Sequence, residues 1–181
     1  MKFSVNQKDL QQSLGFCQGV IEKRSTLPIL SNILLEAYNS KLKITATDLD
    51  LIFINEINDV EVIEEGKTTT TSSTLYDIIR KFSSGKKINF NLTTENKIQL
   101  ESEKSVFNLN CMSADEFPLM EENFTENEFV LKSKQFLKLL SKCKFSISTD
   151  ETRHYLSGIY FHQTQVDDKH YLTAAATDSH R

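Results

Sequence analysis

Residues 30–48 read LSNILLEAYNSKLKITATD and predict a β-hairpin. Apolar residues fill positions 33–35, and residues 42–47 alternate between apolar and polar types with the period of two that is typical of a strand. Between them lie Tyr38-Asn39-Ser40-Lys41, whose polar residues favour a turn. The stretch then ends at Ala46-Thr47-Asp48, a tripeptide that occurs again further along the chain.

The same pattern returns at residues 156–178, which read LSGIYFHQTQVDDKHYLTAAATD. Leu156-Ser157-Gly158-Ile159 follows its counterpart Leu30-Ser31-Asn32-Ile33 at a distance of 126 positions, whereas the tripeptide at 176–178 follows its own at 130. Four additional residues in the Gln165–His170 hairpin would account for the difference. We therefore expect an internal repeat.

An amphipathic helix precedes each hairpin. Apolar residues with helical spacing occur at Leu10, Leu14 and Cys17, and again 126 positions later at Phe136, Leu140 and Cys143. A helix, a hairpin and a tripeptide in the same order predict a duplicated domain, because the period is too long for a solenoid. The expected fold class is α+β, with antiparallel sheets covered by helices on one face.

Further elements complete each copy. The first copy is predicted to contain a helix that Asn6 caps, strands at 51–57, 60–63, 68–71, 88–92, 98–100 and 106–111, and a second helix capped by Ser72 or Ser73. The second copy is predicted to contain strands at 129–131, 155–162 and 172–177 and a helix at 133–145. The first copy ends near Pro118, while the second has only its early strands at Arg181. We therefore expect a piece of a longer protein, or a chain that a partner completes.

Composition excludes several classes of protein. The chain has 181 residues and a formal net charge of −4, which taken alone argues against a protein that wraps DNA by charge. Its three cysteines form no paired motif, so a disulfide framework or a zinc site is not expected and a reducing cytoplasm fits best. No apolar run is long enough to span a membrane.

Two groups of residues could suggest enzyme chemistry. Asp48 and Asp50 resemble a metal-binding carboxylate pair, but no third ligand is evident, and a turn or strand-end role for Asp48 is favoured because it recurs as Asp178. Asp178-Ser179-His180 has the residue types of a hydrolase triad, yet sequence neighbours rarely reach that geometry. No P-loop or dinucleotide-binding glycine pattern is present. We expect no catalytic residue, no metal and no cofactor.

Several blocks together resemble the bacterial DNA polymerase III beta subunits, the sliding clamps. These blocks are Met1–Phe3, Arg24–Asn32, Ala46–Leu49, Ala114–Pro118, Arg153–Gly158 and Ala176–Arg181. They span the whole chain in the family's order and spacing. The resemblance implies the DNA-clamp fold, in which three similar α+β domains follow in tandem and two chains close head to tail into a ring around duplex DNA. Residues 1–121 would be domain one, residues 122–181 the first part of domain two, and domain three would be absent.

The resemblance also implies a function. The family's ring confers processivity on the replicative polymerase by enclosing DNA, with helices on its inner wall that present Lys and Arg to phosphates. The implied partners are double-stranded DNA, a second copy of the chain, the ATP-dependent clamp loader, and the polymerase alpha subunit and other proteins with clamp-binding motifs. The implied location is the bacterial cytoplasm, at the nucleoid. The clamp itself performs no chemistry and is an accessory subunit of the DNA-directed DNA polymerase.

Some residues match DNA-contacting positions of the family. Arg24 matches an arginine after the first helix, while His154 and Tyr155 occupy the positions of a tyrosine pair of which only Tyr155 keeps its type. Two further contact positions fall on Ser73 and Asp150, neither of which carries the usual group, and Asp150 would repel phosphate. Lys134, Lys138 and Lys142 recur at intervals of four on the helix that the resemblance places on the inner wall.

Other residues match protein-binding surfaces of the family. Leu156, Thr177, His180 and Arg181 match part of the groove that binds clamp-binding peptides. Ile78, Phe107 and Leu109 match the domain-one side of the ring's subunit interface. An alternative hypothesis is a protein-interaction module of duplicated α+β domains with no role on DNA, and an enzyme that uses Asp48 and Asp50 is a more remote one.

Overall fold

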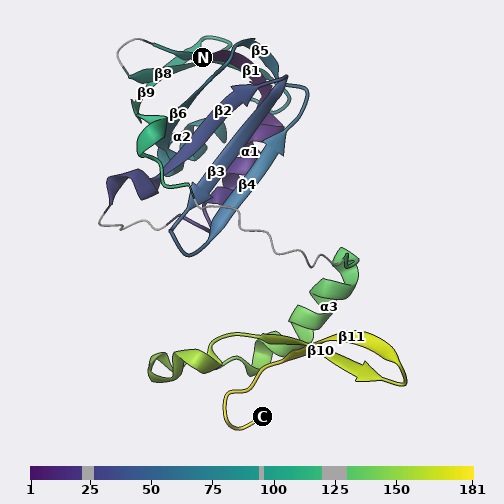
Figure 1. Ribbon diagram of the computed structural model, residues 1–181. Helices are drawn as coiled ribbons and strands as arrows, with labels where there is room; N and C mark the ends of the chain where they lie inside the picture. The colour runs from purple at the N-terminus through teal and green to yellow at the C-terminus, as the bar shows by residue number, and fades with distance from the viewer. Residues whose placement is uncertain (22–26, 94–95, 120–129) are drawn as a thin grey trace. The chain divides into compact units, whose positions relative to one another are not determined.

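The computed structural model describes residues 1–21, 27–93, 96–119 and 130–181 (Figure 1). The chain divides into two compact units, Met1–Glu122 and Asn123–Arg181, and each is described by itself. In the described part of the chain, no helix is both long enough and apolar enough to cross a membrane.

The first unit is a nine-stranded sheet in which every pair of neighbours is antiparallel. Its strands are β1 (Lys2–Asn6), β2 (Asn32–Tyr38), β3 (Lys41–Thr47), β4 (Ile52–Ile57), β5 (Glu61–Glu64), β6 (Gly66–Thr71), β7 (Lys87–Leu92), β8 (Lys97–Ser102) and β9 (Ser105–Met112). Their order across the sheet is β4-β3-β2-β6-β9-β8-β7-β1-β5. Short 3-10 helices lie at Pro28–Ser31 and Ala114–Glu116. The expected α+β class is confirmed.

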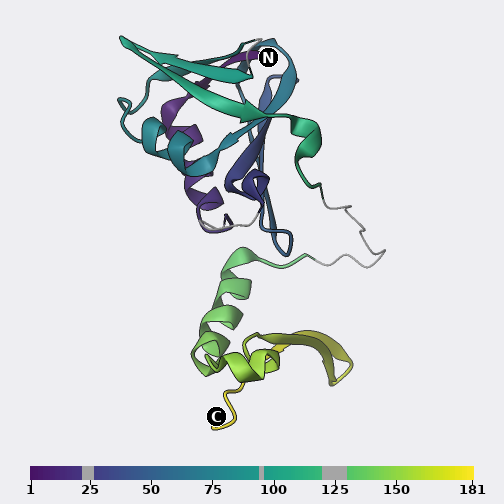
Figure 2. The ribbon, with the colours of Figure 1, turned by 90° about the vertical axis from the view of Figure 1, so that its left-hand side faces the viewer.

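Two helices, α1 (Gln7–Cys17) and α2 (Ser72–Ile79), lie side by side against one face of this sheet (Figure 2). Polar side chains join them: the buried Gln7 donates from Nε2 to the carbonyl of Ile79 at 2.9 Å, and the half-buried Gln18, directly after α1, donates from Nε2 to Ser72 Oγ at 2.7 Å. The apolar stripe of α1 is buried in the core beneath them, with Leu14 and Cys17 fully covered.

The helix starts were predicted with mixed success. Asn6 caps α1 as expected, since its side-chain oxygen accepts the backbone N–H of Lys8 at 2.9 Å. The predicted caps of α2 were wrong. Thr71 is its N-cap and makes no side-chain capping bond, whereas Ser72 is the first residue of the helix and is buried. Ser72 serves packing between the helices instead, through its bond from Gln18.

The second unit contains α3 (Ser133–Cys143) and a single hairpin of β10 (Tyr160–Val166) and β11 (Lys169–Ala175), joined by short 3-10 helices at Lys144–Ser146 and Glu151–Leu156. Phe136 of α3 stacks on Phe161 of β10, with ring centroids 5.7 Å apart. Among the described residues, no apolar side chain of this unit is fully buried. The unit is therefore a helix on a two-stranded sheet with little core.

One predicted strand of the second copy was wrong, and the bounds of the two others were shifted. Residues 130 and 131 form no strand, and residue 129 lies outside the described part of the chain. In the first unit the corresponding β1 pairs with β5 and β7, and no counterparts of those strands occur among the described residues of the second unit. The strand expected at 155–162 begins only at Tyr160, because residues up to Leu156 form a 3-10 helix. The next strand begins at Lys169 rather than 172.

The two hairpins confirm the repeat but correct its register. Both turn on two residues with positive φ, Asn39-Ser40 (46° and 58°) and Asp167-Asp168 (48° and 60°), which is the type I′ geometry that fits strand twist. The β2–β3 hairpin pairs Leu34–Tyr38 with Lys41–Thr45, while β10 pairs along all of Tyr160–Val166 with β11. The four additional residues thus lie two in each strand, and the turn keeps its length.

Candidate nucleic-acid interface and peptide groove

A row of three lysines lies along α3. Lys134, Lys138 and Lys142 are exposed and spaced by four, so their ammonium groups project from one face of the helix. None of the ion pairs between described residues involves any of the three. Residues 132–144 contain five lysines and no Asp or Glu. This helix presents concentrated positive charge with no acidic side chain beside it in the sequence.

Charge is distributed unevenly along the chain. Residues 130–181 contain eight Lys and Arg against five Asp and Glu, a formal net charge of +3. Residues 1–120 contain thirteen against sixteen, a net charge of −3. The net charge of −4 for the whole chain therefore combines an acidic first unit with a basic segment at residues 130–181. Electrostatic attraction for a polyanion is concentrated in this basic segment.

Asp150 is not the isolated anion that the sequence suggested. It caps the 3-10 helix at Glu151–Leu156, accepting from the backbone N–H and the hydroxyl of Thr152 at 3.0 and 2.6 Å, and it forms an ion pair with Arg153 Nε at 2.8 Å. The Thr152 hydroxyl, followed by Arg153, lowers the pKa of this carboxyl from 3.8 to about 2. The adjacent guanidinium of Arg153 therefore compensates the negative charge of this carboxylate.

His154 and Tyr155 lie on the next turn of that 3-10 helix. Their rings meet edge to face with centroids 6.1 Å apart, and Tyr155 is 72% exposed. An exposed aromatic edge beside a histidine suits contact with a sugar or a base. Ser73, the other diverged position, is an exposed residue of α2. Arg24 lies outside the described residues.

The two threonine–aspartate loops are built alike. Thr47 Oγ donates to the carbonyl of Leu51, and Asp48 accepts the backbone N–H groups of Asp50 and Leu51 at 3.0 and 2.7 Å. In the second copy, Thr177 Oγ donates to the carbonyl of Arg181, and Asp178 accepts from His180 and Arg181 at 3.0 and 3.1 Å. The turn role expected for Asp48 is confirmed.

The second loop also shows how the residues of the suggested triad are bonded. The carboxylate of Asp178 accepts backbone N–H groups and Arg181 Nε, while Ser179 Oγ accepts from Arg153 Nη1, which is loop architecture and not a triad. In the part of the chain that the structure describes, no three His, Cys, Asp or Glu side chains cluster as metal ligands would.

A small pocket of about 200 Å³ lies beside the second of these loops. Its lining residues come from the 3-10 helix, from both strands of the hairpin and from the loops that flank them: Tyr155, Leu156, Gly158, Tyr160, Ala175, Ala176 and Thr177. It brings together two residues of the predicted peptide groove, Leu156 and Thr177. It does not include His180 or Arg181, and the guanidinium of Arg181 instead lies over the ring of Phe145 at 5.5 Å.

The predicted subunit interface lies where α2 ends beside β9. Phe107 is 39% exposed and meets Phe82 edge to face at 5.7 Å, while Ile78 and Leu109 are partly buried against the core. The structure therefore brings the three predicted residues to one region of the first unit, where they remain partly accessible.

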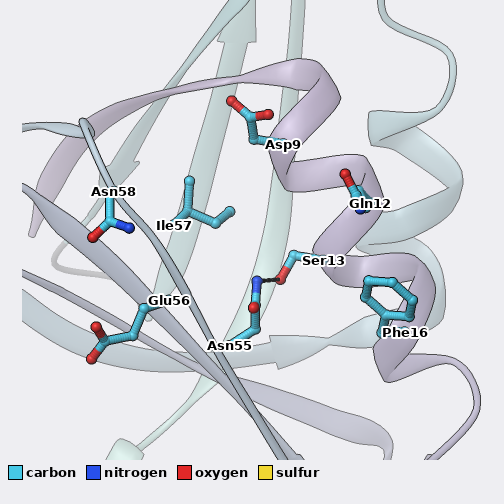
Figure 3. A pocket seen from close by; sticks show the side chains of 8 residues that line it. All are labelled: Asp9, Gln12, Ser13, Phe16, Asn55, Glu56, Ile57 and Asn58. Atoms are coloured by element: carbon cyan, nitrogen blue, oxygen red, sulfur yellow. Dashed lines mark hydrogen bonds between the residues drawn. The ribbon is translucent and has the colours of Figure 1, made fainter. Parts of the chain in front are cut away.

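A polar pocket of about 280 Å³ opens between α1 and β4 (Figure 3). Asp9, Gln12 and Phe16 of α1 form one side, and Asn55 of β4 forms a bridge to Ser13 Oγ at 2.8 Å across its floor. Sequence reasoning assigned none of these residues to a binding site. Sequence reasoning also missed Arg153, although an Asp followed three positions later by an Arg is a pattern that predicts a capped, ion-paired turn.

Comparison with known proteins gives consistent matches to one family. Residues 1–121 match the family model of the DNA polymerase III beta subunit, N-terminal domain, and residues 130–181 match that of the central domain. Curated relatives named beta sliding clamp, from Caulobacter vibrioides, Rickettsia felis and Escherichia coli K12, are 36%, 36% and 33% identical over the whole chain. The chain spans about half the length of these relatives, 49%, 46% and 48%.

Solved structures agree with the sequence matches. A sliding clamp of Caulobacter crescentus superposes with a TM-score of 0.94 at 35% identity, covering 99% of this chain and 48% of that one. A DNA polymerase III subunit beta of Pseudomonas aeruginosa gives 0.90 at 27% identity, with 99% and 48% covered.

Proposed function

The chain belongs to the DNA polymerase III beta subunit family, and from that membership we propose that it supplies the first domain and part of the second domain of a DNA sliding clamp. In this proposal residues 1–121 form domain one and residues 122–181 begin domain two. The assembled ring encloses duplex DNA and holds the replicative polymerase on it without chemistry of its own. The clamp acts as an accessory subunit of the polymerase holoenzyme, and it works at the nucleoid because its DNA is there.

The observation that carries the proposal is the lysine row of α3. A ring that retains DNA by enclosure needs little affinity for bases, but its inner wall must not repel phosphates. Three ammonium groups on a helix without acidic residues meet that need while the first unit stays acidic. Arg24, His154 and Tyr155 are proposed to add contacts to the sugar–phosphate backbone, and the Asp150–Arg153 pair keeps a carboxylate from opposing them.

Protein partners are proposed to use two other surfaces. Leu156 and Thr177, which line the small pocket, are proposed to form part of a groove for short peptides of the polymerase alpha subunit, the clamp loader and other clamp-binding proteins. His180 and Arg181, which do not line that pocket, are proposed to contribute to the same groove. Ile78, Phe107 and Leu109 form one side of the contact that closes the ring head to tail. Pairs of aromatic and aliphatic side chains that stay partly exposed are typical of such contacts.

Salt-dependent DNA binding by the chain tests the role of α3. A variant with Lys134, Lys138 and Lys142 all changed to Gln should lower the slope of log affinity against log salt by about 2 to 3, since each phosphate contact contributes about 0.9. Fluorescence anisotropy with a labelled duplex measures this. The matched control changes Lys41, Lys67 and Lys87 to Gln, which alters the net charge equally at ion-paired sites of the first unit. Equal slopes for the two variants would contradict the proposal.

Retention on DNA tests the enclosure itself. A ring assembled from full-length subunits should stay on closed circular DNA and leave when the circle is cut, because a linear end lets the ring slide off. Equal retention on both forms would favour the alternative of a protein-interaction module that touches DNA only by charge.

A further inference from the structure

Among the described residues of the first unit, three buried apolar side chains lie outside the main core beneath α1 and α2: Leu30, Leu34 and Phe117. Leu34 alternates along β2 with residues of that core, so its side chain points to the opposite, outer face of the sheet. There its cross-strand neighbours are Thr45 of β3 and Thr69 of β6, and both are buried as well. Something other than the helices therefore covers this part of the outer face.

The cover is the segment that follows β9, residues 113–118, which we call the strap. Asp115 of the strap forms an ion pair with Lys67 of β6 at 2.7 Å. Lys67 lies two positions before Thr69, so its side chain is on the same outer face. Phe117 follows two residues after Asp115 and is only 4% exposed. The ion pair thus holds the strap where the ring of Phe117 packs over the outer face.

The same positions of the second unit form the open pocket of about 200 Å³ beside the second threonine–aspartate loop. Tyr160 of β10 pairs with Ala175 just as Leu34 of β2 pairs with Thr45. Both second-unit residues line the pocket, where Tyr160 is 69% exposed, and the counterpart of Leu30 lines it too. No counterpart of the strap occurs among the described residues of the second unit. The first unit therefore closes a site that the second unit leaves open.

Thr45 shows that the strap does not satisfy every group that it covers. Its side chain is 1% exposed, and its hydroxyl has no hydrogen-bond partner in the part of the chain that the structure describes. Burying a hydroxyl without a partner lowers stability. A ligand that brought a polar atom to Thr45 would make a hydrogen bond that the strap does not make, which favours exchange of the strap for another peptide.

We propose that the patch of Leu30, Leu34 and Thr45 is a peptide-binding site that the strap occupies from within the same chain. Its ligand is a short segment that places an aromatic side chain where Phe117 lies, an acidic residue near Lys67 and a polar atom near Thr45. Because the strap is tethered, its effective concentration is about millimolar or higher, and a free peptide must compete with it. The inference rests on the proposed function only in treating the pocket of the second unit as a site for peptides.

A free copy of the strap tests the site in the full 181-residue chain. The probe is the end-blocked peptide Ser-Ala-Asp-Glu-Phe-Pro-Leu, the sequence of residues 113–119, and methyl NMR of the leucines follows its binding. In the variant Phe117→Ala the tethered ring is gone, so the peptide should shift the Leu34 methyl signals at a concentration at least about tenfold lower than in the unchanged chain. A peptide that carries the same Phe117→Ala change is the control and should leave these signals in place.

A second variant loosens the strap without removing a buried side chain. Asp115→Asn abolishes only the exposed ion pair with Lys67 and should improve the apparent affinity for the peptide about two- to fivefold, since such pairs contribute little. Glu116→Gln is the matched control. Glu116 is exposed and takes part in no ion pair between described residues, so this variant should bind the peptide like the unchanged chain.

Other outcomes would overturn the proposal. If Phe117→Ala stays folded and the peptide leaves the Leu34 signals unmoved, the strap is only a cover for the sheet. If Phe117→Ala does not fold, Asp115→Asn decides, and an affinity equal to that of Glu116→Gln contradicts the proposal. The Leu156 signals report the pocket of the second unit in the same titration. Shifts at Leu156 without shifts at Leu34 support the proposed peptide groove and overturn this inference, whereas shifts at Leu34 alone support this inference and contradict the groove.

Discussion

A residue's neighbours decide what its charge does, as Asp150 illustrates. From the sequence it reads as an anion at a position where the family places a DNA contact, and repulsion was the natural expectation. In the structure its two oxygens are fully engaged by Thr152 and Arg153, and the same turn projects His154 and Tyr155. The sequence also carries the signal for this compensation, an Arg three positions after the Asp, but sequence reasoning did not use it.

The depressed pKa of Asp150 predicts a pH effect that the Thr152 hydroxyl controls. Because the pKa in the folded chain is about 2, below the ordinary 3.8, this group stabilises the turn above about pH 4 and loses that contribution as the pH falls through about 2. Thr152→Val removes the largest cause and should raise the pKa toward its ordinary value in a carboxyl NMR titration. Thr152→Ser keeps a hydroxyl and should leave it low. An unmoved pKa in the valine variant would show that Arg153 and the backbone N–H of residue 152 set it without the hydroxyl.

Asp48 should prove a structural residue of its loop. Asp48→Ala leaves two backbone N–H groups without their acceptor and should lower the free energy of unfolding by about 1 kcal/mol, whereas Asp48→Asn keeps an oxygen and should cost less. Urea denaturation measures both. Divalent cations should not raise the free energy of unfolding of the unchanged chain or of either variant. Stabilisation by Mg²⁺ that vanishes in Asp48→Asn would revive the metal-site hypothesis.

At the scale of elements, sequence periodicity predicted the helices and turns that residues a few positions apart determine. It missed the strand boundaries that depend on partner strands elsewhere in the fold. The helix at 133–143, the β-hairpin turns and the cap at Asn6 all follow from spacing and turn chemistry within a few residues. The strand expected at 129–131 depends on partners that its own sequence does not contain. Residues 155 and 156 do not extend the strand: the backbone departs from helical dihedrals at Arg153, and a second short 3-10 turn follows, closed by bonds from Ser157 to the carbonyl of His154.

The β2–β3 turn can be stabilised by a single glycine. Ser40 has φ = 58°, a conformation that costs a non-glycine residue energy and that glycine adopts freely, and Asn-Gly is a preferred type I′ pair. Ser40→Gly should therefore raise the free energy of unfolding of the first unit by about 0.5 kcal/mol, and Ser40→Val should lower it. Thermal unfolding monitored by circular dichroism compares the two. Destabilisation by glycine would mean that the Ser40 side chain contributes contacts that outweigh strain.

The repeat provides a matched pair of core positions. Leu14 of α1 is fully buried, whereas its counterpart Leu140 in α3 is only partly covered. Leu14→Ala should cost about 2 to 5 kcal/mol, and Leu140→Ala clearly less, because a partly open site leaves little cavity. Native-state hydrogen exchange of each helix reports the two losses separately. Equal losses would imply that α3 is more deeply packed in solution than the structure indicates.

At the scale of the whole molecule, the two units should differ in stability. The first unit has a continuous core beneath α1 and α2, while no apolar side chain is fully buried among the described residues of the second. Amide protons of β2, β3 and α1 should therefore exchange much more slowly than those of β10, β11 and α3. Hydrogen exchange followed by mass spectrometry measures this. If a second copy or another partner covers the second unit, protection there should rise with its concentration.

The unequal lengths of the two hairpins have an evolutionary consequence. Adding two residues to each strand leaves every side chain on its original face and preserves the turn, whereas adding one would turn the rest of the strand over or require a bulge. Drift between the duplicated copies is thus confined to steps of four residues per hairpin. Among homologous chains we expect hairpin lengths at this position to fall into classes four apart, and lineages that break the series should carry a bulge where the count becomes odd.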